Sequence, residues 1–196
     1  MEILKSIKQR YSLRKYADKE VENEKINRCL EAARLAPSAC NAQPWKFVVV
    51  NDPELRDKVA NAARADLLGM NTFVDEAPVI IAIVMEPANA TSTLGSKIKK
   101  KHYPLIDIGI AAEHICLQAT EEGLGTCMIG WLNEKKVKKL LGIPKSRRVP
   151  LLITMGYERE IKQHERGRKT FDKVVSFNQY KADKTQIQGI KDFQTE

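Results

Sequence analysis

An almost uninterrupted apolar run, VIIAIV at residues 79–84, constrains the fold of this chain more than any other feature. It follows Pro78, is rich in β-branched residues and has the length of a strand. A strand without polar alternation is buried on both faces, so both sides of its sheet must be covered. The run therefore predicts a layered fold that contains helices as well as strands.

Further patterns supply the other elements of such a fold. Short apolar runs bounded by turn residues predict strands at 46–50, 126–129 and 149–157. Helical spacing and N-cap residues (Asn23, Asp52 and Asn133) predict helices at 2–9, 24–36, from 53 onward, 66–75, 105–122 and 133–144. Helices and strands share one core, which favours an α/β sandwich with a small central sheet and leaves parallel and mixed pairing open.

The polar C-terminal end of the chain and the absence of long apolar stretches suggest how the chain divides into a domain and a tail, and where the protein is located. The 196 residues suit one domain, expected at 1–175, followed by a tail at 176–196 that is too polar to form a core and could wrap on a partner. No apolar run is long enough to span a bilayer, and MEILKSIKQR lacks the apolar stretch of a signal peptide. We therefore expect a cytoplasmic protein.

The cysteines, histidines and net charge disfavour several classes of protein. The four cysteines have no C-x-x-C spacing, so we expect buried free thiols, and the three dispersed histidines give no reason to expect a metal site. A net charge of +8 can attract nucleic acid, a membrane or an anionic small molecule. The lysines at 97–101 lack interleaved aromatic residues, so a solvated loop is a better interpretation than a nucleic-acid site.

The helix at 105–122 is apolar on more than one face. In a chain of this length, a second subunit is the simplest cover for its outer side, so we expect a homodimer. The residues that suggest this are Leu105, Ile106, Ile108, Ile110, Ala111, Ala112, Ile115, Cys116, Leu117 and Ala119.

Three polar stretches could carry a binding site. RYSLRKY places Arg10, Ser12 and Arg14 at alternate positions. This pattern is typical of either an anion-binding site or a solvated surface patch. APSACNAQPW predicts a loop that is stiffened by prolines and carries short polar side chains. It could be either a ligand-binding loop or an ordinary capped turn. RGRKTF is a second basic cluster, which would hold a phosphate if it converged with the first.

The glycines of GLGTCMIG do not form a dinucleotide fingerprint, because both their spacing and the order of helix and strand are wrong. Gly130 differs from the other two because it follows a strand, where it could let a ligand approach the backbone. No spacing indicates a Ser-His-Asp, Cys-His or twin-carboxylate arrangement. An enzyme of this sequence would therefore depend on a bound cofactor.

Taken in order, these stretches resemble the nitroreductase family of flavin mononucleotide (FMN) enzymes over Ile3 to Val175. The resemblance rests on RYSLRKY, AARLAPSACNAQPWKFVVV, APVIIAIV, IDIGIAAEHICLQATEEGLGTCMIGW and GRKTF. It implies a three-layer α-β-α sandwich with a small mixed, mainly antiparallel central sheet. It also implies a homodimer with FMN at the subunit interface, NADH or NADPH as co-substrate and no metal.

The resemblance also assigns roles to particular residues. Arg10, Tyr11, Ser12 and Arg14 match a segment on the phosphate, ribityl chain and pyrimidine edge. Arg168 matches a C-terminal phosphate-binding position, which Arg166 or Lys169 could assist. Pro37, Ser38, Ala39 and Asn41 match a loop that reaches the flavin of the other subunit. Asn71 matches a flavin-contacting asparagine. Ile129 and Gly130 match backbone near flavin N5. No side chain is catalytic; Arg14 and Gly130 would tune the flavin.

The implied activity is reduction of nitroaromatics, quinones or similar acceptors by a ping-pong hydride transfer. Related flavin reactions, namely enone reduction, dehalogenation and flavin fragmentation, are alternatives, as is a flavin-binding protein without activity. Two departures from the family pattern affect the expected contacts to FMN and the expected substrate. Ala39 stands where a second serine is common, and the lysine-rich 87–102 region would cover the substrate side.

Overall fold

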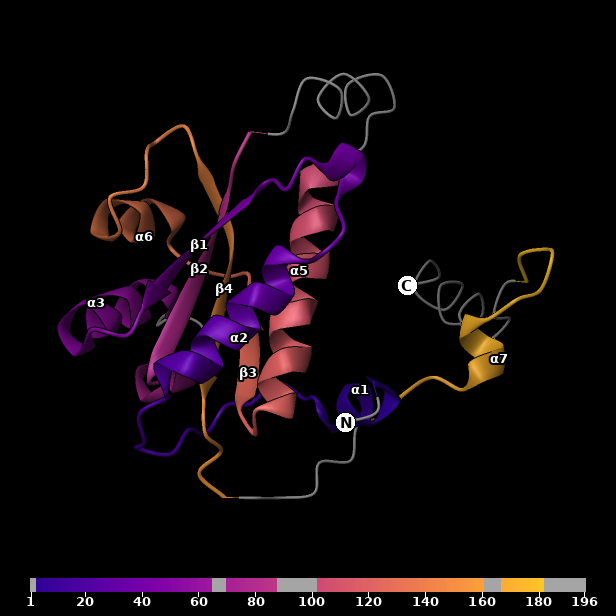
Figure 1. Ribbon diagram of the computed structural model, residues 1–196, viewed down its shortest axis with the longest axis horizontal. Helices are drawn as coiled ribbons and strands as arrows, with labels where there is room; N and C mark the ends of the chain where they lie inside the picture. Colours follow the sequence, from indigo (N-terminus) through magenta and orange to yellow (C-terminus); the bar gives the residue numbers. More distant parts are fainter. Residues whose placement is uncertain (1–2, 65–69, 88–101, 161–166, 182–196) are drawn as a thin grey trace, which may run out of the picture. The chain divides into compact units, whose positions relative to one another are not determined.

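The computed structural model describes residues 3–64, 70–87, 102–160 and 167–181. The chain divides into two compact units, Met1–Ile161 and Lys162–Glu196, and the second contains α7 (Phe171–Val174). The first unit contains α1 (Ile3–Gln9), α2 (Asn23–Arg34), η1 (Ala39–Asn41), β1 (Trp45–Val50), α3 (Pro53–Ala63), η3 (Thr72–Glu76), β2 (Val79–Met85), α5 (Tyr103–Glu121), β3 (Gly125–Ile129), α6 (Glu134–Leu140) and β4 (Arg148–Gly156) (Figure 1).

The four strands form one sheet in the order β1-β2-β4-β3, and each neighbouring pair is antiparallel. In the central pair, Ile81 lies opposite Ile153. In the described part of the chain, parallel pairing is limited to an isolated bridge between Ser12 and Thr126. The expected small, mainly antiparallel sheet is thus confirmed.

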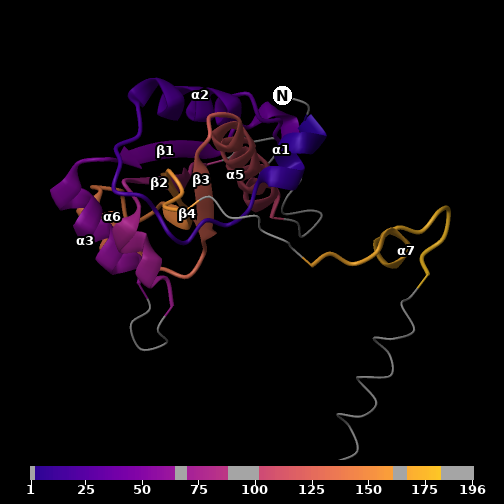
Figure 2. The ribbon, with the colours of Figure 1, turned by 90° about the horizontal axis from the view of Figure 1, so that it is seen from below.

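Strand β2 lies between the two larger cores of this unit, as its unbroken apolar sequence predicts. Val79, Ile81 and Ile83 face α2 and α5, whereas Ile80, Ala82 and Val84 face α3 and α6. All six side chains are almost fully buried. Helices therefore cover both faces of the sheet, which gives the three-layer arrangement that Figure 2 presents end-on.

Two of the three expected helix caps are present. The Asp52 and Asn133 side chains accept backbone hydrogen bonds from Leu55 (2.8 Å) and Lys136 (3.0 Å). The expectation for Asn23 is wrong, because Asn23 is already the first helical residue of α2 and Glu22 holds the cap position. The carboxylate of Glu22 is used elsewhere, since it accepts a hydrogen bond from Tyr157 Oη at 2.6 Å.

The long apolar helix is also confirmed as α5, and Gly123 follows its end with a φ of +73°. The helix expected at 66–75 is wrong for the described residues 70 and 71, since Asn71 has a left-handed φ of +61°. The 3₁₀-helix η3 begins at 72, and residues 65–69 lie outside the described part. Most of the 87–102 region lies outside it too. None of the described helices is long and apolar enough to cross a membrane.

Candidate functional site

Residues 10–14 lie against β3, where they form the first part of the candidate site. Leu13 N donates to Thr126 O at 2.9 Å, and Ser12 forms the parallel bridge with Thr126. Leu13 packs closely on Gly125, since a Cβ at Gly125 would lie 2.3 Å from Leu13 Cδ2. Glycine at this position therefore lets the segment approach the strand.

Tyr16 anchors the end of this segment in the core. Its side chain is 1% exposed, and its hydroxyl donates to Leu13 O at 3.0 Å and shares a 2.7 Å hydrogen bond with Thr154 Oγ1. Burial is the main cause that raises the pKa of Tyr16 far above its usual value, so the hydroxyl stays protonated. Backbone pairing and this tyrosine together fix the path of residues 10–16.

The two arginines of the segment differ in their partners. Arg10 Nε lies 3.4 Å from Glu113 Oε1 on α5. Arg14 is exposed, and its guanidinium lies 5.9 Å from the centre of the Phe73 ring. Among the described residues, Arg14 has no carboxylate partner. It is therefore a cation that can bind an anion without first breaking an ion pair.

Three polar side chains of the segment act on one thiol. Burial raises the pKa of Cys127 in β3, while Arg14, the Ser12 hydroxyl and Arg10 act in the opposite direction. These three predicted residues therefore lie near the same strand. Tyr11 is directed differently, because it packs against the small core of Leu13 and Tyr16, and its pKa is raised by burial and then by Glu158.

The end of β3 brings together two more predicted residues. Ile129 is buried, whereas Gly130 is exposed and a Cβ there would meet no atom within 4 Å. Asn71 Nδ2 donates to the carbonyls of Trp131 (3.0 Å) and Ala63 (3.1 Å), and Asn71 has a φ of +61°. The asparagine thus fixes the backbone next to Gly130.

The loop at 37–43 contains three non-glycine residues in the left-handed region, Cys40, Asn41 and Gln43, with φ between +46° and +53°. Such backbone is strained and is often found at ligand sites. Gln43 N donates to Ser38 Oγ at 2.9 Å, so the Ser38 hydroxyl proton can still be donated to another group. The loop is therefore held in one shape with polar groups on its surface.

Asp107 of α5 forms a hydrogen bond that connects this loop to the helix. No sequence pattern indicated this role. Its Oδ1 accepts a hydrogen bond from Ala39 N at 3.1 Å, and the residue is 3% exposed. The available signal was a single carboxylate inside the apolar stretch LIDIGIAA. An ionisable group on a buried helix face needs a hydrogen-bonding reason to be there.

Segment 10–14 and loop 37–43 lie toward different ends of α5. Asp107, near the start of the helix, contacts the loop, whereas the segment pairs with Thr126, which comes after the end of the helix. The helix has 19 residues, so it is about 28 Å long. The two polar regions are therefore held at different points along α5, although the Arg10 side chain reaches Glu113 near the middle of the helix.

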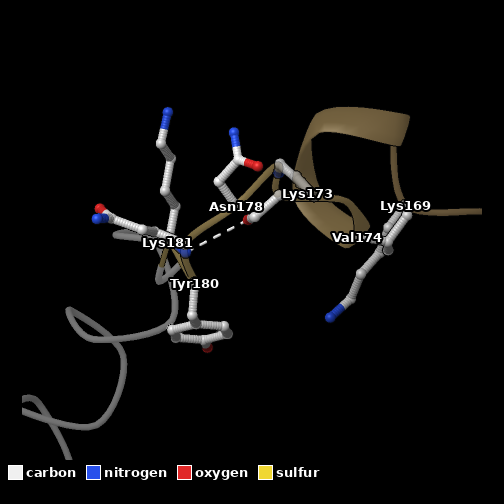
Figure 3. A pocket seen from close by; sticks show the side chains of 8 residues that line it. Lys169, Lys173, Val174, Asn178, Tyr180 and Lys181 are labelled. Carbon is white, nitrogen blue, oxygen red and sulfur yellow. Dashed lines mark hydrogen bonds between the residues drawn. The ribbon is translucent and has the colours of Figure 1, made fainter.

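The predicted C-terminal residues belong to the second unit. Arg168 Nη1 donates to the carbonyl of Gly167 at 3.0 Å, and Arg166 lies outside the described residues. Lys169 lines an open, basic pocket of about 500 Å³ (Figure 3). The other lining residues are Lys173, Val174, Ser176, Asn178, Gln179, Tyr180 and Lys181.

The buried thiols are not activated as nucleophiles. Three of the four free cysteines are buried, and burial is the main cause that raises the pKa of Cys29 to about 12 and of Cys116 to about 11. The expectation of four buried thiols is wrong for Cys40, which is exposed because it lies in the surface turn η1. The described residues include no cluster of three metal-ligating side chains.

Comparison with known proteins identifies one family. The model described as Nitroreductase family matches residues 7–69 and 65–157. A relative in Archaeoglobus fulgidus, provisionally named NADH dehydrogenase/NAD(P)H nitroreductase, is 34% identical over 167 residues, which are 82% of this chain and 88% of the relative.

Two further proteins extend this comparison. The solved FMN-dependent nitroreductase of Clostridium difficile R20291 is 32% identical, covers 90% of this chain and 99% of its own, and has a TM-score of 0.74. Iodotyrosine deiodinase 1 of Rattus norvegicus is 27% identical over 197 residues, which are 89% of this chain and 68% of that protein.

Proposed function

The chain belongs to the nitroreductase family, and from that premise we propose that it is an FMN-dependent oxidoreductase that uses NADH or NADPH. The observation that carries the proposal is the exposed Arg14 guanidinium, which has no carboxylate partner among the described residues and lies beside β3. A cation without a counter-ion beside the strand that Gly130 follows suits a ligand that combines a flat ring with negative charge.

The residues present fit this cofactor. Arg10, Ser12 and Arg14 offer guanidinium and hydroxyl donors on one side of β3, and the space around Gly130 is open. In this proposal the segment at 10–14, with Tyr11 as part of its packing, holds the phosphate, ribityl chain and pyrimidine edge. For Arg168, with Arg166 or Lys169, the phosphate-binding role stays a prediction from the family resemblance.

FMN, when bound, supplies the hydride chemistry, so that NAD(P)H and an acceptor such as a nitroaromatic or a quinone react in turn by a ping-pong scheme. The protein contributes binding and charge. Arg14 would stabilise negative charge on the pyrimidine edge. The Asn71 oxygen would accept a hydrogen bond from the ligand, and the Ile129–Gly130 backbone would orient the ring and leave its other face open to substrate.

A homodimer would complete the site. Loop 37–43, with Pro37, Ser38, Ala39 and Asn41, lies toward the other end of α5 from segment 10–14, so the loop of one copy would serve the flavin of the second. Exposed apolar side chains favour such pairing. They are Ile3, Leu4 and Ile7 on α1, and Leu105 and Ile106 on α5, all between 46% and 74% exposed in the single chain.

The experiment that tests the function is spectroscopic. The purified protein should be yellow, and anaerobic NADH or NADPH should bleach its absorbance near the visible flavin bands until an acceptor is added. A colourless protein that does not bind added FMN would disprove the proposal. Sedimentation at micromolar concentration tests the dimer, which a monomer would contradict.

Reductive dehalogenation is a second candidate, because the similarity to iodotyrosine deiodinase covers 89% of this chain. Both reactions would use the same FMN contacts and differ in the acceptor. Product analysis with a nitroaromatic, a quinone and a halotyrosine, each supplied to the reduced enzyme, separates the two. Release of halide at a rate that exceeds nitro or quinone reduction would favour the second candidate.

A further inference from the structure

Asp107 is a carboxylate on the buried side of α5, next in sequence to Ile108 of the main core. Both residues are 3% exposed in the single chain. Placing a carboxyl group in such surroundings is unfavourable unless hydrogen bonds compensate for the lost water. A polar residue retained there therefore has a structural or functional task.

The hydrogen bonds of Asp107 are unequal. Oδ1 accepts from Ala39 N at 3.1 Å, whereas Oδ2 is buried without a partner among the described residues. The residue thus keeps an unsatisfied acceptor in order to hold a single backbone N–H of another element. This N–H belongs to the first residue of η1, in the loop that the proposed function assigns to the flavin.

The loop needs such a contact because its own backbone is unfavourable. Cys40, Asn41 and Gln43 all have φ near +50°, a conformation that L-residues adopt only when their surroundings enforce it. Gln43 N donates to Ser38 Oγ within the loop, and Trp45 N at the start of β1 donates to the Gln43 carbonyl at 2.8 Å, so these bonds tie the loop to itself and to the strand that follows it. Asp107 connects it to a long helix and so defines where the loop lies.

We propose that Asp107 is a positioning residue for the cofactor site: through Ala39 N it holds loop 37–43 in the shape that presents Ser38 and Asn41 to FMN. The inference rests on the proposed function for the identity of the ligand. The effect on loop shape does not depend on it. Asp107 acts through the loop and is not expected to touch the cofactor.

The test compares Asp107→Leu, which removes the acceptor at similar volume, with Asp107→Asn, which keeps an acceptor oxygen. In the cofactor-free protein, hydrogen exchange of peptides spanning 37–43 should be about tenfold faster in Asp107→Leu and within about threefold of wild type in Asp107→Asn. The FMN dissociation constant should rise about tenfold in the first variant and stay within about threefold in the second.

A matched control separates positioning from general loss of stability. Val137→Ala opens a cavity in α6, which packs on α3 and β4, and should lower the melting temperature without changing loop exchange or FMN affinity. Unchanged exchange and affinity in Asp107→Leu would overturn the inference. A wild-type protein that does not bind FMN would instead overturn the proposed function, while the exchange result could still be interpreted.

A second variant covers the case in which Asp107→Leu does not fold. Ala39→Pro removes the donor of the same hydrogen bond at the surface, and the extended Ser38 (φ −145°, ψ 154°) tolerates a following proline. This variant should also speed exchange of residues 40–43 and weaken FMN binding about tenfold. Wild-type exchange and affinity in Ala39→Pro would count against the role of the Asp107–Ala39 bond.

Discussion

Segment 10–14 and loop 37–43 both present polar groups to the proposed site, but they are held by different means. The segment is fixed by a backbone bond to β3 and by the buried Tyr16. The loop contains left-handed residues and depends on the side chains of Ser38 and Asp107. Substitution in the segment should therefore change chemistry at constant shape, whereas substitution around the loop should change shape.

The largest expected difference is in thiol reactivity, because each region has its own cysteine. At pH 8, in cofactor-free protein diluted until it is monomeric, Ellman's reagent should modify Cys40 on the exposed loop roughly a thousandfold faster than Cys127 beneath the segment. Burial excludes the reagent from Cys127 and raises its pKa, so its thiolate is scarce at this pH and its reaction should keep accelerating above pH 8.5. Peptide mapping by mass spectrometry measures both rates.

Cys40→Ser should remove the fast phase and leave the slow phases unchanged. Comparable rates at the two cysteines in the wild-type protein would mean that the segment does not cover β3 as described, and the contrast between the two regions would be lost.

The next largest effect should come from Gly125→Ala. The added methyl group would collide with Leu13 at distances of 2.3 and 2.8 Å, so we expect a loss of about 1–3 kcal/mol in the free energy of unfolding by urea. Gly130→Ala is the matched control, because its methyl group enters open space. It should leave stability unchanged and weaken FMN binding. Equal stabilities of the two variants would refute close packing of the segment on β3.

Substitution of the two arginines should change the binding and reduction potential of the cofactor without changing the shape of the segment. Arg10→Ala should weaken FMN retention about tenfold, and Arg14→Ala should lower the flavin reduction potential by on the order of 30 mV with a smaller effect on binding. Equilibrium dialysis and potentiometric titration measure these quantities, and Arg14→Lys should restore most of the potential. Negligible effects of both alanine variants would make the stretch a solvated patch.

The smallest expected effect concerns strain in the loop. In Cys40→Gly the residue at a φ of +53° has no Cβ, so the strain of the left-handed conformation is relieved. The free energy of unfolding should rise by no more than about 1 kcal/mol, and the melting temperature should change only slightly. Calorimetry measures it. The same change should loosen the loop and weaken FMN binding about twofold to threefold. Tighter FMN binding in this variant would argue against strain as the means of holding the loop.

Apolar periodicity was sufficient to predict most of the fold. VIIAIV became β2, with alternate residues in the two cores, and Asp52 and Asn133 cap helices as their sequence context indicates. Asn23 was misassigned because the competing position, Glu22, differs by a single residue and is decided by its backbone and by Tyr157. Local patterns specify which element forms more reliably than they specify its first residue.

The candidate site was less accessible to sequence reasoning. Periodicity could not reveal that Arg10, Ser12 and Arg14 gather at Cys127, since this depends on pairing across more than a hundred residues. Asp107 was missed because its role depends on a tertiary hydrogen bond to Ala39. The roles of Arg166, Arg168 and Lys169 stay predictions that come from the family resemblance.

The bridges of the N-terminal segment have a consequence for synthesis of the chain. Ser12 pairs with Thr126, and Tyr16 pairs with Glu158, so these residues find their partners only when nearly the whole first unit has emerged from the ribosome. Its two arginines are therefore translated early and ordered late. FMN should not bind a nascent chain that ends before β3, and cofactor capture would mark the completion of folding.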